Sequence, residues 1–510
     1  MALVESTESG GGERRRLLLR SPATLDALGE IEVQAADDVA AAVETARKAQ
    51  PEWAGLSCDE RGSYVRRAVR MLVESRDELV DVIAADTGKP RLEALAGELL
   101  PACDAATFYA KRAKQILADQ RVRLHLIRKK KLRICYQPLG VVGIITPWNF
   151  PFLLSMNPTV QALLAGNTVV LKPSEATPFA GGLVERVFEA VGLPGGVFNL
   201  VQGDGETGAA LVESGVDKIH FTGSVRTGRQ VAEVCGRLLK PCTLELGGKD
   251  PMIVCADADL ELAAAGAVWG AFANSGQACT STERVYVVDK VADAFINKVL
   301  EKTAELRQGV SGDFELGPII WPPQLEVIER QVAEAVEGGA VLRAGGRRNP
   351  SCQGLFYEPT VLTEVSQDMS VMRDETFGPV MPIMRVRDEE QALRLANDSR
   401  YGLNANVWTK NKHKGVEIAK ALESGNVVVN DCMLTYGVTE SPFGGTKESG
   451  IGRVNGGQAL RAYCHTRSIV VDRFGSGTGA VWYPYTQGKL KRFQRVVRFV
   501  WGTPLGRFLS

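Results

Sequence analysis

Short apolar segments alternate with amphipathic helical segments from Gly140 onward, and this alternation restricts the chain to few folds. Val141–Ile145 and Thr168–Leu171 are apolar and rich in β-branched residues, which is typical of buried strands. Residues 174–191 have the spacing of a helix, and a second alternating stretch covers about residues 253–428. Strands separated by helices of this length predict parallel sheets covered by helices on both faces, which is an α/β fold.

The residues before Gly140 are organised differently. Residues 1–20 are rich in Gly, Ser and Glu and predict a loose leader, whereas the periodicity over residues 35–118 is helical. Residues 121–136 alternate apolar and polar side chains on either side of a basic run, residues 128–131, so we expect a pair of strands joined as a hairpin. We interpret the basic run as a solvated turn rather than a binding patch.

Composition excludes several classes of protein. The length of 510 residues predicts about three structural units. Lys plus Arg and Asp plus Glu both number 60, and this balance argues against nucleic-acid binding. Ten cysteines without a Cys-x-x-Cys pair indicate reduced thiols and a cytoplasmic location, and no signal peptide or membrane span is recognisable. The four histidines lie far apart in sequence, so we expect neither a metal site nor a Ser-His-Asp hydrolase.

One of the cysteines, Cys279, follows a turn-forming run, Asn274–Gly276, that breaks a helical pattern. A thiol at a turn is available for reaction, although most cysteines are simply small buried side chains. Glu245 lies earlier, in an apolar strand pattern that stops at Gly247 and Gly248. A carboxylate in such apolar surroundings is a candidate base for a thiol nucleophile, and its simpler interpretation is a helix cap or a salt-bridge partner.

Two glycine-containing turns are candidate phosphate sites. Gly203–Gly208 spells G-x-G-x-x-G, which is a weak signal by itself. Phe221–Gly228 is the better anion cradle, because a strand pattern ends there at Gly-Ser and a helix pattern begins. The free N–H groups and the dipole of such a helix would point at one spot.

Together, seven short motifs resemble the aldehyde dehydrogenase superfamily, and the resemblance covers roughly residues 21–473. In chain order they are Pro147–Pro151, Lys172–Glu175, Phe221–Ser224, Leu244–Lys249, Asn274–Cys279, Glu375–Pro379 and Pro442–Gly445. A single motif of this length arises by chance, whereas seven in one order are specific. The resemblance implies a Rossmann-like NAD-binding domain, an α/β catalytic domain and a β-hairpin oligomerisation element.

The resemblance also implies domain boundaries. Residues 21–118 and 139–246 would form the NAD-binding domain, and residues 247–446 the catalytic domain. Residues 119–138 and 447–473 would form the oligomerisation element of a homodimer or homotetramer. The last strand of this element reads Ser-Ile-Val-Val, an edge pattern that favours pairing with another chain.

The family's catalytic roles carry over to three residues. Cys279 is expected to attack the aldehyde carbon, with Asn149 donating its side-chain amide to the oxyanion. The adduct would lose a hydride to NAD and leave a thioester, and Glu245 would activate the water that hydrolyses it. Phe150, Leu154 and Phe443 are the implied walls of the substrate tunnel.

The resemblance implies that the cofactor is NAD. Lys172 and Glu175 would hold the adenosine ribose, and a carboxylate there accepts from the 2′-hydroxyl but repels a 2′-phosphate. Gly223 and Ser224 would face the pyrophosphate, whereas the family uses Gly203–Gly208 only as a structural turn. Glu375 would hold the nicotinamide ribose, Phe377 would pack beside the ring, and Trp148 would line the same cleft. Gln324 is a further candidate ribose contact.

The C-terminal tail, residues 474–510, departs from the family pattern because it contains no Asp or Glu. Residues 489–501 predict an amphipathic helix with an apolar and a basic face. A helix of this kind favours weak contact with a membrane surface, and packing on the protein or on a neighbouring subunit is the alternative.

The expected activity is therefore NAD-dependent oxidation of a small-molecule aldehyde to the carboxylic acid. One alternative is a coenzyme A-acylating aldehyde dehydrogenase, which the presence of Glu245 argues against, because a thiol acceptor needs no activated water. The other alternative is a non-catalytic structural or membrane-binding protein on the same fold, which the presence of both Cys279 and Glu245 argues against.

Overall fold

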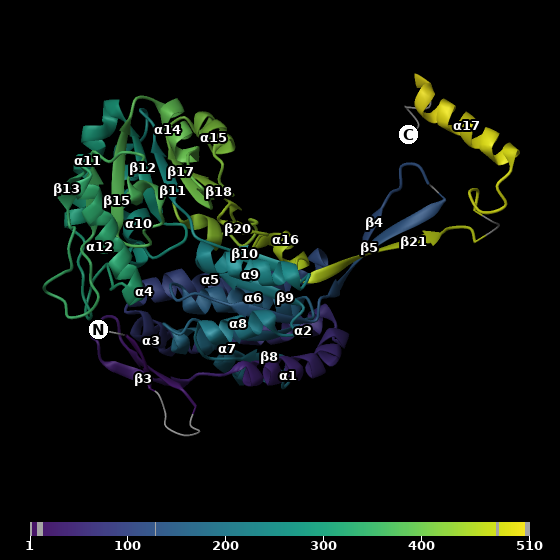
Figure 1. The fold of residues 1–510 in the computed structure, drawn as a ribbon, viewed down its shortest axis with the longest axis horizontal. Helices are drawn as coiled ribbons and strands as arrows, with labels where there is room; N and C mark the ends of the chain where they lie inside the picture. Colours follow the sequence, from purple (N-terminus) through teal and green to yellow (C-terminus); the bar gives the residue numbers. More distant parts are fainter. Residues whose placement is uncertain (1–2, 8–13, 128, 476–478, 505–510) are drawn as a thin grey trace. The chain divides into compact units, whose positions relative to one another are not determined.

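A computed structural model describes residues 3–7, 14–127, 129–475 and 479–504. The chain forms two compact units. The larger unit comprises Met1–Ile116 and Pro138–Tyr463, and the smaller unit comprises Leu117–Gln137 and Cys464–Ser510. The larger unit contains the two helix-covered parallel sheets that the alternating pattern predicts, so the α/β fold class is confirmed (Figure 1).

A small antiparallel sheet lies near the start of the chain, in the order β1 (Val4–Thr7), β2 (Arg16–Arg20), β3 (Ala27–Glu32). A loose leader is expected over residues 1–20, but β1 and β2 lie within this range, so the expectation is wrong for those residues. Residues 1–2 and 8–13 lie outside the described residues. β2 forms because apolar and polar side chains alternate along it, so that one of its faces can be buried. Leu17 and Leu19 are buried on one face of β2 and pack with Ile31 and Phe179.

A run of helices follows, as the periodicity over residues 35–118 predicts. Ser57 begins one of them with a capping box, in which its hydroxyl accepts from the Glu60 N–H and the Glu60 carboxylate accepts from the Ser57 N–H. A π-helical segment interrupts the run, a feature frequent at functional sites. In order the elements are α1 (Ala36–Gly55), α2 (Cys58–Glu74), α3 (Arg76–Thr87), α4 (Arg91–Ala94), the π-helix η1 (Leu95–Leu99) and α5 (Leu100–Ile116).

The first large sheet has the strand order β20-β10-β9-β6-β7-β8, with β20 antiparallel and the others parallel. The chain order along it reverses between β6 and β9, which is the position where doubly wound folds bind dinucleotides. Its strands are β6 (Val141–Ile145), β7 (Thr168–Lys172), β8 (Phe198–Leu200), β9 (Lys218–Thr222), β10 (Cys242–Glu245) and β20 (Gly450–Ile451). Its helices are α6 (Pro151–Leu164), α7 (Pro178–Ala190), α8 (Gly205–Glu213) and α9 (Val225–Arg237).

The second large sheet has the order β13-β14-β15-β12-β11-β17-β18, and only β13 is antiparallel to its neighbour. Its strands are β11 (Asp250–Val254), β12 (Thr282–Val288), β13 (Val341–Ala344), β14 (Thr360–Thr363), β15 (Val380–Val386), β17 (Asn404–Trp408) and β18 (Asn426–Val429). Its helices are α10 (Leu260–Phe272), η2 (Ala273–Gly276), α11 (Asp289–Ala304), α12 (Pro322–Glu337), α13 (Ser370–Arg373), α14 (Glu389–Asn397) and α15 (Lys412–Ala421). The remaining short elements are β16 (Tyr401–Gly402), β19 (Thr446–Lys447), η3 (Leu434–Gly437) and α16 (Gly456–Arg461).

The smaller unit contains a three-stranded sheet in the order β21 (Cys464–Asp472), β5 (Lys130–Pro138), β4 (Gln120–Val122). The predicted hairpin is confirmed as antiparallel β4 and β5, although Arg128 of its basic run lies outside the described residues. The predicted C-terminal helix is confirmed as α17 (Gln487–Gly502). Among the described residues, no helix combines the length and the apolar character needed to cross a bilayer.

A buried ion pair connects the helical run to the first sheet. Lys89 Nζ donates to Glu98 Oε1 at 2.7 Å and to the carbonyl of Asn149 at 2.8 Å. Glu98 Oε2 accepts from the N–H groups of Phe152 and Leu153, which begin α6. Both charged side chains are fully enclosed, at 1% and 0% exposure. The pair therefore fixes the loop between β6 and α6.

Replacing Lys89 with Met would leave the Glu98 carboxylate buried without its cation. We expect Lys89→Met to lower the free energy of unfolding by about 3–5 kcal/mol, measured by urea denaturation. Lys111→Met is the matched control, because Lys111 lies exposed on α5, and it should change the free energy by less than about 0.5 kcal/mol. Equal stability of the two variants would contradict this account of the pair.

Candidate active site

A cleft of about 660 Å³ lies in the larger unit, where the carboxyl ends of β6, β9 and β10 face loops of the second sheet. The structure brings every residue that the sequence singled out for catalysis or cofactor binding to the wall of this one cleft. They are Trp148, Asn149, Lys172, Glu175, Gly223, Ser224, Glu245, Cys279, Glu375 and Phe377. Motifs separated by more than two hundred residues thus share one space.

The turn before Cys279 has an unusual backbone. Asn274 and Ser275 adopt φ values of 51° and 54°, in the left-handed region that non-glycine residues rarely occupy. Gly276 continues with φ 71°, and a Cβ there would lie 2.1 Å from the carbonyl oxygen of Gly378. Three successive residues of positive φ reverse the chain after α10 and direct Cys279 to the cleft. Only glycine fits the third position.

Hydrogen bonds compensate the strain of this turn. The Asn274 side-chain amide donates to the carbonyls of Asn149 and Gln277, both at 3.1 Å. The Asn274 N–H donates to Glu93 Oε1 at 2.8 Å, and the Ser275 hydroxyl donates to the Gly317 carbonyl at 2.7 Å. Burial raises the pKa of Glu93 to about 7. The turn before Cys279 is therefore hydrogen-bonded both to the Asn149 loop and to the helical run before the first sheet.

Cys279 and Glu245 interact directly. The two side chains lie side by side in the cleft, and burial raises the pKa of the Glu245 carboxyl to about 8. Glu245 Oε1 is buried without a hydrogen-bond partner among the described residues. Burial, and next the negative charge of Glu245, raise the pKa of the Cys279 thiol well above its ordinary value. Glu245 ends β10, where its carbonyl also accepts from the Gly223 N–H at 3.1 Å. The resting site thus holds a protonated thiol beside a carboxylate that exchanges its proton near neutral pH.

Asn149 lines the same cleft as Cys279 and Glu245. Its side-chain amide donates to the Gln277 carbonyl at 3.0 Å, and only 3% of the residue is exposed. Its Oδ1 is buried without a hydrogen-bond partner among the described residues. Its own carbonyl accepts from Lys89 and from Asn274. An amide held from both sides in this way presents a fixed, uncharged donor close to Cys279.

Another part of the cleft wall contains the residues that are expected to hold the ribose and the phosphates. Lys172 Nζ lies 3.0 Å from Glu175 Oε2, and the glutamate side chain is 26% exposed. Ser224 caps α9 by accepting from the Thr227 N–H at 3.2 Å. The glycine-rich turn at residues 203–208 also lies on this wall, where Asp204 caps α8. That turn therefore borders the cleft, and its role as a structural turn rather than the phosphate site stays a prediction.

The near part of the cleft is built around Glu375. Its Oε1 accepts from the Gly248 N–H at 2.9 Å, and burial raises its pKa to about 8. A Cβ on Gly247 would lie 2.2 Å from Glu375 Oε2, so a glycine there lets the carboxylate approach the backbone. The rings of Trp148 and Phe377 meet edge to face, with centroids 5.3 Å apart.

A second buried ion pair holds this loop. Lys249 Nζ lies 2.7 Å from Glu283 Oε2 and donates to the Thr376 hydroxyl at 2.9 Å. Glu283 accepts from the N–H groups of Thr376 and Phe377. The segment that follows Glu375 is thus fixed by charge-assisted hydrogen bonds.

The apolar wall beside Cys279 includes two of the predicted tunnel residues. Leu154 lines the cleft, and Phe443 is fully buried with Cys279 and Tyr436 packed against its cluster. Phe150 instead lies under the Lys89 ammonium, 4.4 Å from its ring centroid. Gln324 lines the cleft and donates to the Thr376 carbonyl at 2.7 Å.

Sequence reasoning missed the residues that position these groups. Lys89, Glu98, Lys249 and Glu283 form the two buried pairs, and Glu93 accepts from the turn before Cys279. Lys249 lies inside a quoted motif, yet its role was not recognised. In a sequence these side chains look like ordinary surface charges, because nothing in the local pattern shows that a lysine or glutamate is enclosed.

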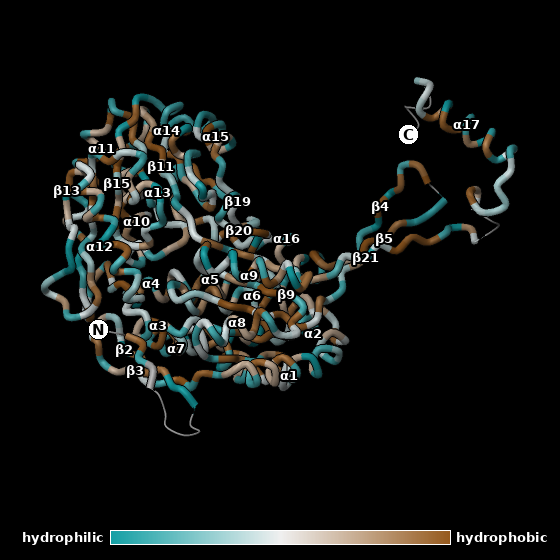
Figure 2. Tube along the Cα trace, in the orientation of Figure 1, coloured by the Kyte–Doolittle hydropathy of each residue, from teal (hydrophilic) through white to brown (hydrophobic). Residues whose placement is uncertain are grey.

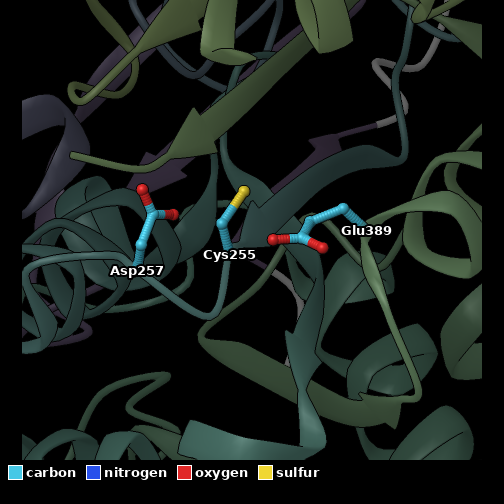
Figure 3. A group of neighbouring side chains, drawn as sticks. All are labelled: Cys255, Asp257 and Glu389. Atoms are coloured by element: carbon cyan, nitrogen blue, oxygen red, sulfur yellow. The ribbon is translucent and has the colours of Figure 1, made fainter. Parts of the chain in front are cut away.

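One further cluster could be taken for a metal site. Cys255, Asp257 and Glu389 point toward one another (Figure 3). The ammonium of Lys414 already lies 3.1 Å from Asp257 Oδ1 and 2.7 Å from Glu389 Oε1. A cation of the protein therefore neutralises these carboxylates, and we interpret the cluster as structural.

Comparison with known proteins agrees with this geometry. The profile of the aldehyde dehydrogenase family matches residues 10–469. A 4,4'-diapolycopene aldehyde oxidase of Methylomonas sp is 38% identical over 89% of this chain and 86% of its own length. A putative succinate-semialdehyde dehydrogenase [NADP(+)] of Mycolicibacterium smegmatis is 42% identical over 88% of this chain and 87% of its own. The NAD+ complex of an aldehyde dehydrogenase from Bacillus cereus superposes with a TM-score of 0.86 at 35% identity, covering 90% of this chain and 93% of that one.

The match extends over nearly the whole chain and includes both large sheets and the cleft between them. The order of the motifs, the strained turn before the thiol and the buried carboxylate beside it all lie within the matched residues. On this evidence the chain belongs to the aldehyde dehydrogenase family.

Proposed function

We propose that this enzyme oxidises an aldehyde to the carboxylic acid through a covalent intermediate on Cys279, with NAD as the cofactor. The observation that carries the proposal is the position of the Cys279 thiol beside the buried Glu245 carboxylate on the wall of one cleft. A nucleophile paired with a base, in a cleft that also offers groups suited to a dinucleotide, matches the chemistry of aldehyde oxidation.

The first step forms a bond between the Cys279 sulfur and the aldehyde carbon. The thiol proton passes to Glu245, whose raised pKa of about 8 suits it to accept a proton from a weakly acidic thiol. The carbonyl oxygen becomes an oxyanion, and the Asn149 amide is the donor that would stabilise it. Because Asn149 is uncharged and held by Gln277, it can stabilise the anion without protonating it.

The residues present fit a dinucleotide. Lys172 and Glu175 would hold the adenosine ribose, Gly223 and Ser224 the pyrophosphate at the start of α9, and Glu375 the nicotinamide ribose. When bound, NAD supplies the hydride acceptor that turns the tetrahedral adduct into a thioester. Trp148 and Phe377, whose rings meet edge to face, would restrict the space for the nicotinamide ring.

Hydrolysis of the thioester completes the reaction. After Glu245 has released the thiol proton to solvent, it removes a proton from water and the hydroxide adds to the thioester carbon. The carbon–sulfur bond then breaks to release the acid, and Glu245 returns its proton to the Cys279 thiolate. Burial of the carboxylate supports this role, since a desolvated glutamate is a stronger base than an exposed one. The same residue argues against acyl transfer to coenzyme A, in which no water needs activation.

We further propose NAD rather than NADP, and this rests on Glu175. Its partly exposed carboxylate faces the cleft beside Lys172, where a 2′-phosphate would meet a negative charge. Relatives differ in this respect, because the Bacillus cereus enzyme was solved with NAD+ while the Mycolicibacterium smegmatis relative is named for NADP(+).

The domain roles are part of the proposal. Residues 21–118 and 139–246 would bind NAD, and residues 247–446 would supply the nucleophile. Residues 119–138 and 447–473 would join subunits into a homodimer or homotetramer. Three consecutive exposed apolar residues near the end of β21, Ile469, Val470 and Val471, support this oligomerisation role.

Removal of the thiol tests the central proposal. We expect Cys279→Ala to lower kcat/KM for NADH formation by at least about 10⁴-fold and to abolish esterase activity on p-nitrophenyl acetate, because both need the same nucleophile. Cys352→Ala, which changes a partly exposed cysteine elsewhere, should retain both activities. Aldehyde oxidation that survives in Cys279→Ala would refute the covalent mechanism.

The raised pKa of Glu245 predicts a pH profile. The pKa of the carboxyl is about 8, so it is mostly protonated when the pH is lower and can act as a base when the pH is higher. We expect kcat to rise by about tenfold per pH unit between about pH 6 and 8 and to level off above about pH 9. Glu245→Gln should remove this rise and lower the plateau by about 10²-fold or more. A flat profile in the unmodified enzyme would exclude Glu245 as the rate-controlling base.

The charge of Glu175 predicts cofactor preference. We expect Glu175→Gln to reduce the ratio of kcat/KM for NAD to that for NADP by at least about tenfold, because repulsion of the 2′-phosphate is lost. Glu189→Gln on the exposed face of α7 is the matched control and should leave the ratio unchanged. An unmodified enzyme that prefers NADP would overturn the proposal for NAD.

A further inference from the structure

The chain after Asp472 differs in charge from the rest of the protein. It contains seven basic residues and no acidic residue, whereas the whole chain balances 60 against 60. The positive charge is concentrated in α17, which contains Lys489, Lys491, Arg492, Arg495 and Arg498. A surface helix of a water-soluble domain usually mixes both signs and gains from pairs four residues apart. In α17 the like charges only repel one another.

The side chains of α17 separate into two faces. Successive residues advance by 100°, so the four basic residues after Lys489 share one arc of the helix. The opposite arc is apolar and consists of Leu490, Phe493, Val496, Val497, Val500 and Trp501. Figure 2 shows hydrophobic and hydrophilic segments recurring turn by turn along α17. Phe499 is the one apolar side chain on the basic arc.

The apolar face is open to solvent. No residue of α17 is buried, and Leu490 and Val497 are 51% and 55% exposed. The segment just before the helix is also apolar and exposed, with Trp482 at 62% and Tyr485 at 73%. Trp and Tyr are the side chains enriched where a bilayer meets water. An isolated helix of 16 residues is only marginally stable in water, so burial of this face would stabilise it.

The combination points to one kind of partner. A bilayer with anionic headgroups accepts an apolar face into its acyl boundary and neutralises a basic face at its surface. A second copy of this chain would bury the apolar face, but it would leave the uncompensated basic residues close to one another. The helix, roughly 24 Å long, is suited to lie in the plane of the membrane surface rather than to cross the bilayer.

We propose that residues 481–501 bind the surface of an anionic lipid bilayer, with the apolar face of α17 inserted at the level of the headgroups. Lys491, Arg492, Arg495 and Arg498 then lie among the lipid phosphates. Binding is reversible and salt-dependent, because it rests on one short helix and on charges that ions screen. The proposal is independent of the proposed catalytic function, since the segment contributes no residue to the cleft.

Co-sedimentation with vesicles tests this proposal on the full-length protein. One set of vesicles is phosphatidylcholine alone, and the other contains about 30% phosphatidylglycerol. We expect the protein to pellet with the anionic vesicles and to be released as NaCl rises toward about 1 M. The variant Phe493→Ser/Val497→Ser removes two neighbours on the apolar face, and its partition coefficient should fall by at least about tenfold.

Phe499→Ser is the matched control, because it removes an aromatic side chain from the basic arc of the same helix. It should pellet as the unmodified protein does, and all variants should share one thermal unfolding midpoint. The proposal is overturned if the unmodified protein stays in the supernatant, binds neutral vesicles equally well, or pellets as well with the apolar-face substitutions as without them. A fall in molar mass of Phe493→Ser/Val497→Ser by light scattering, without any vesicle binding, would assign the helix to a contact between copies.

Discussion

Two buried lysine–glutamate pairs hold the loops from which the cleft is made. Lys89 with Glu98 fixes the loop that contains Asn149, and Lys249 with Glu283 fixes the loop that follows Glu375. Burying charge is costly, and these pairs are tolerated because each glutamate also accepts backbone N–H groups and each lysine has a further oxygen partner. These hydrogen bonds hold loops from both sheets in one arrangement around Cys279.

The same enclosure sets the chemistry of the site. Burial is the largest influence on the pKa of Cys279, Glu245 and Glu375, and in each case it disfavours the charged form. A carboxylate whose pKa is raised to about 8 can take and return a proton near neutral pH. Excluding water from the cleft is thus what would let Glu245 act as the proposed base. The strained turn at Asn274 has a related cause, because only a firmly packed surrounding keeps such a backbone in place.

Much of the fold followed from periodicity. The alternation after Gly140 predicted two parallel sheets, and the alternating residues 121–136 predicted the β4–β5 hairpin. The strands at the N-terminus are hard to predict from the sequence, because the Gly-rich segment beside them obscures the alternation in Arg16–Arg20. A strand pattern of five residues is short, and its buried face depends on a partner such as Phe179, far along the chain.

The sequence by itself determined the fold class, the family resemblance and the candidates for the reactive residues, since each motif preserves local turn and strand chemistry that does not need a partner. Only the tertiary structure decided which of these residues meet. It put Cys279 in contact with Glu245, enclosed Lys89 and Lys249, and gave the residue 203–208 turn a place on the cleft. The physical reason is that burial and proximity depend on how elements distant in the sequence pack together. They change the pKa and reactivity of a side chain, and the sequence does not show this because the residue type stays the same.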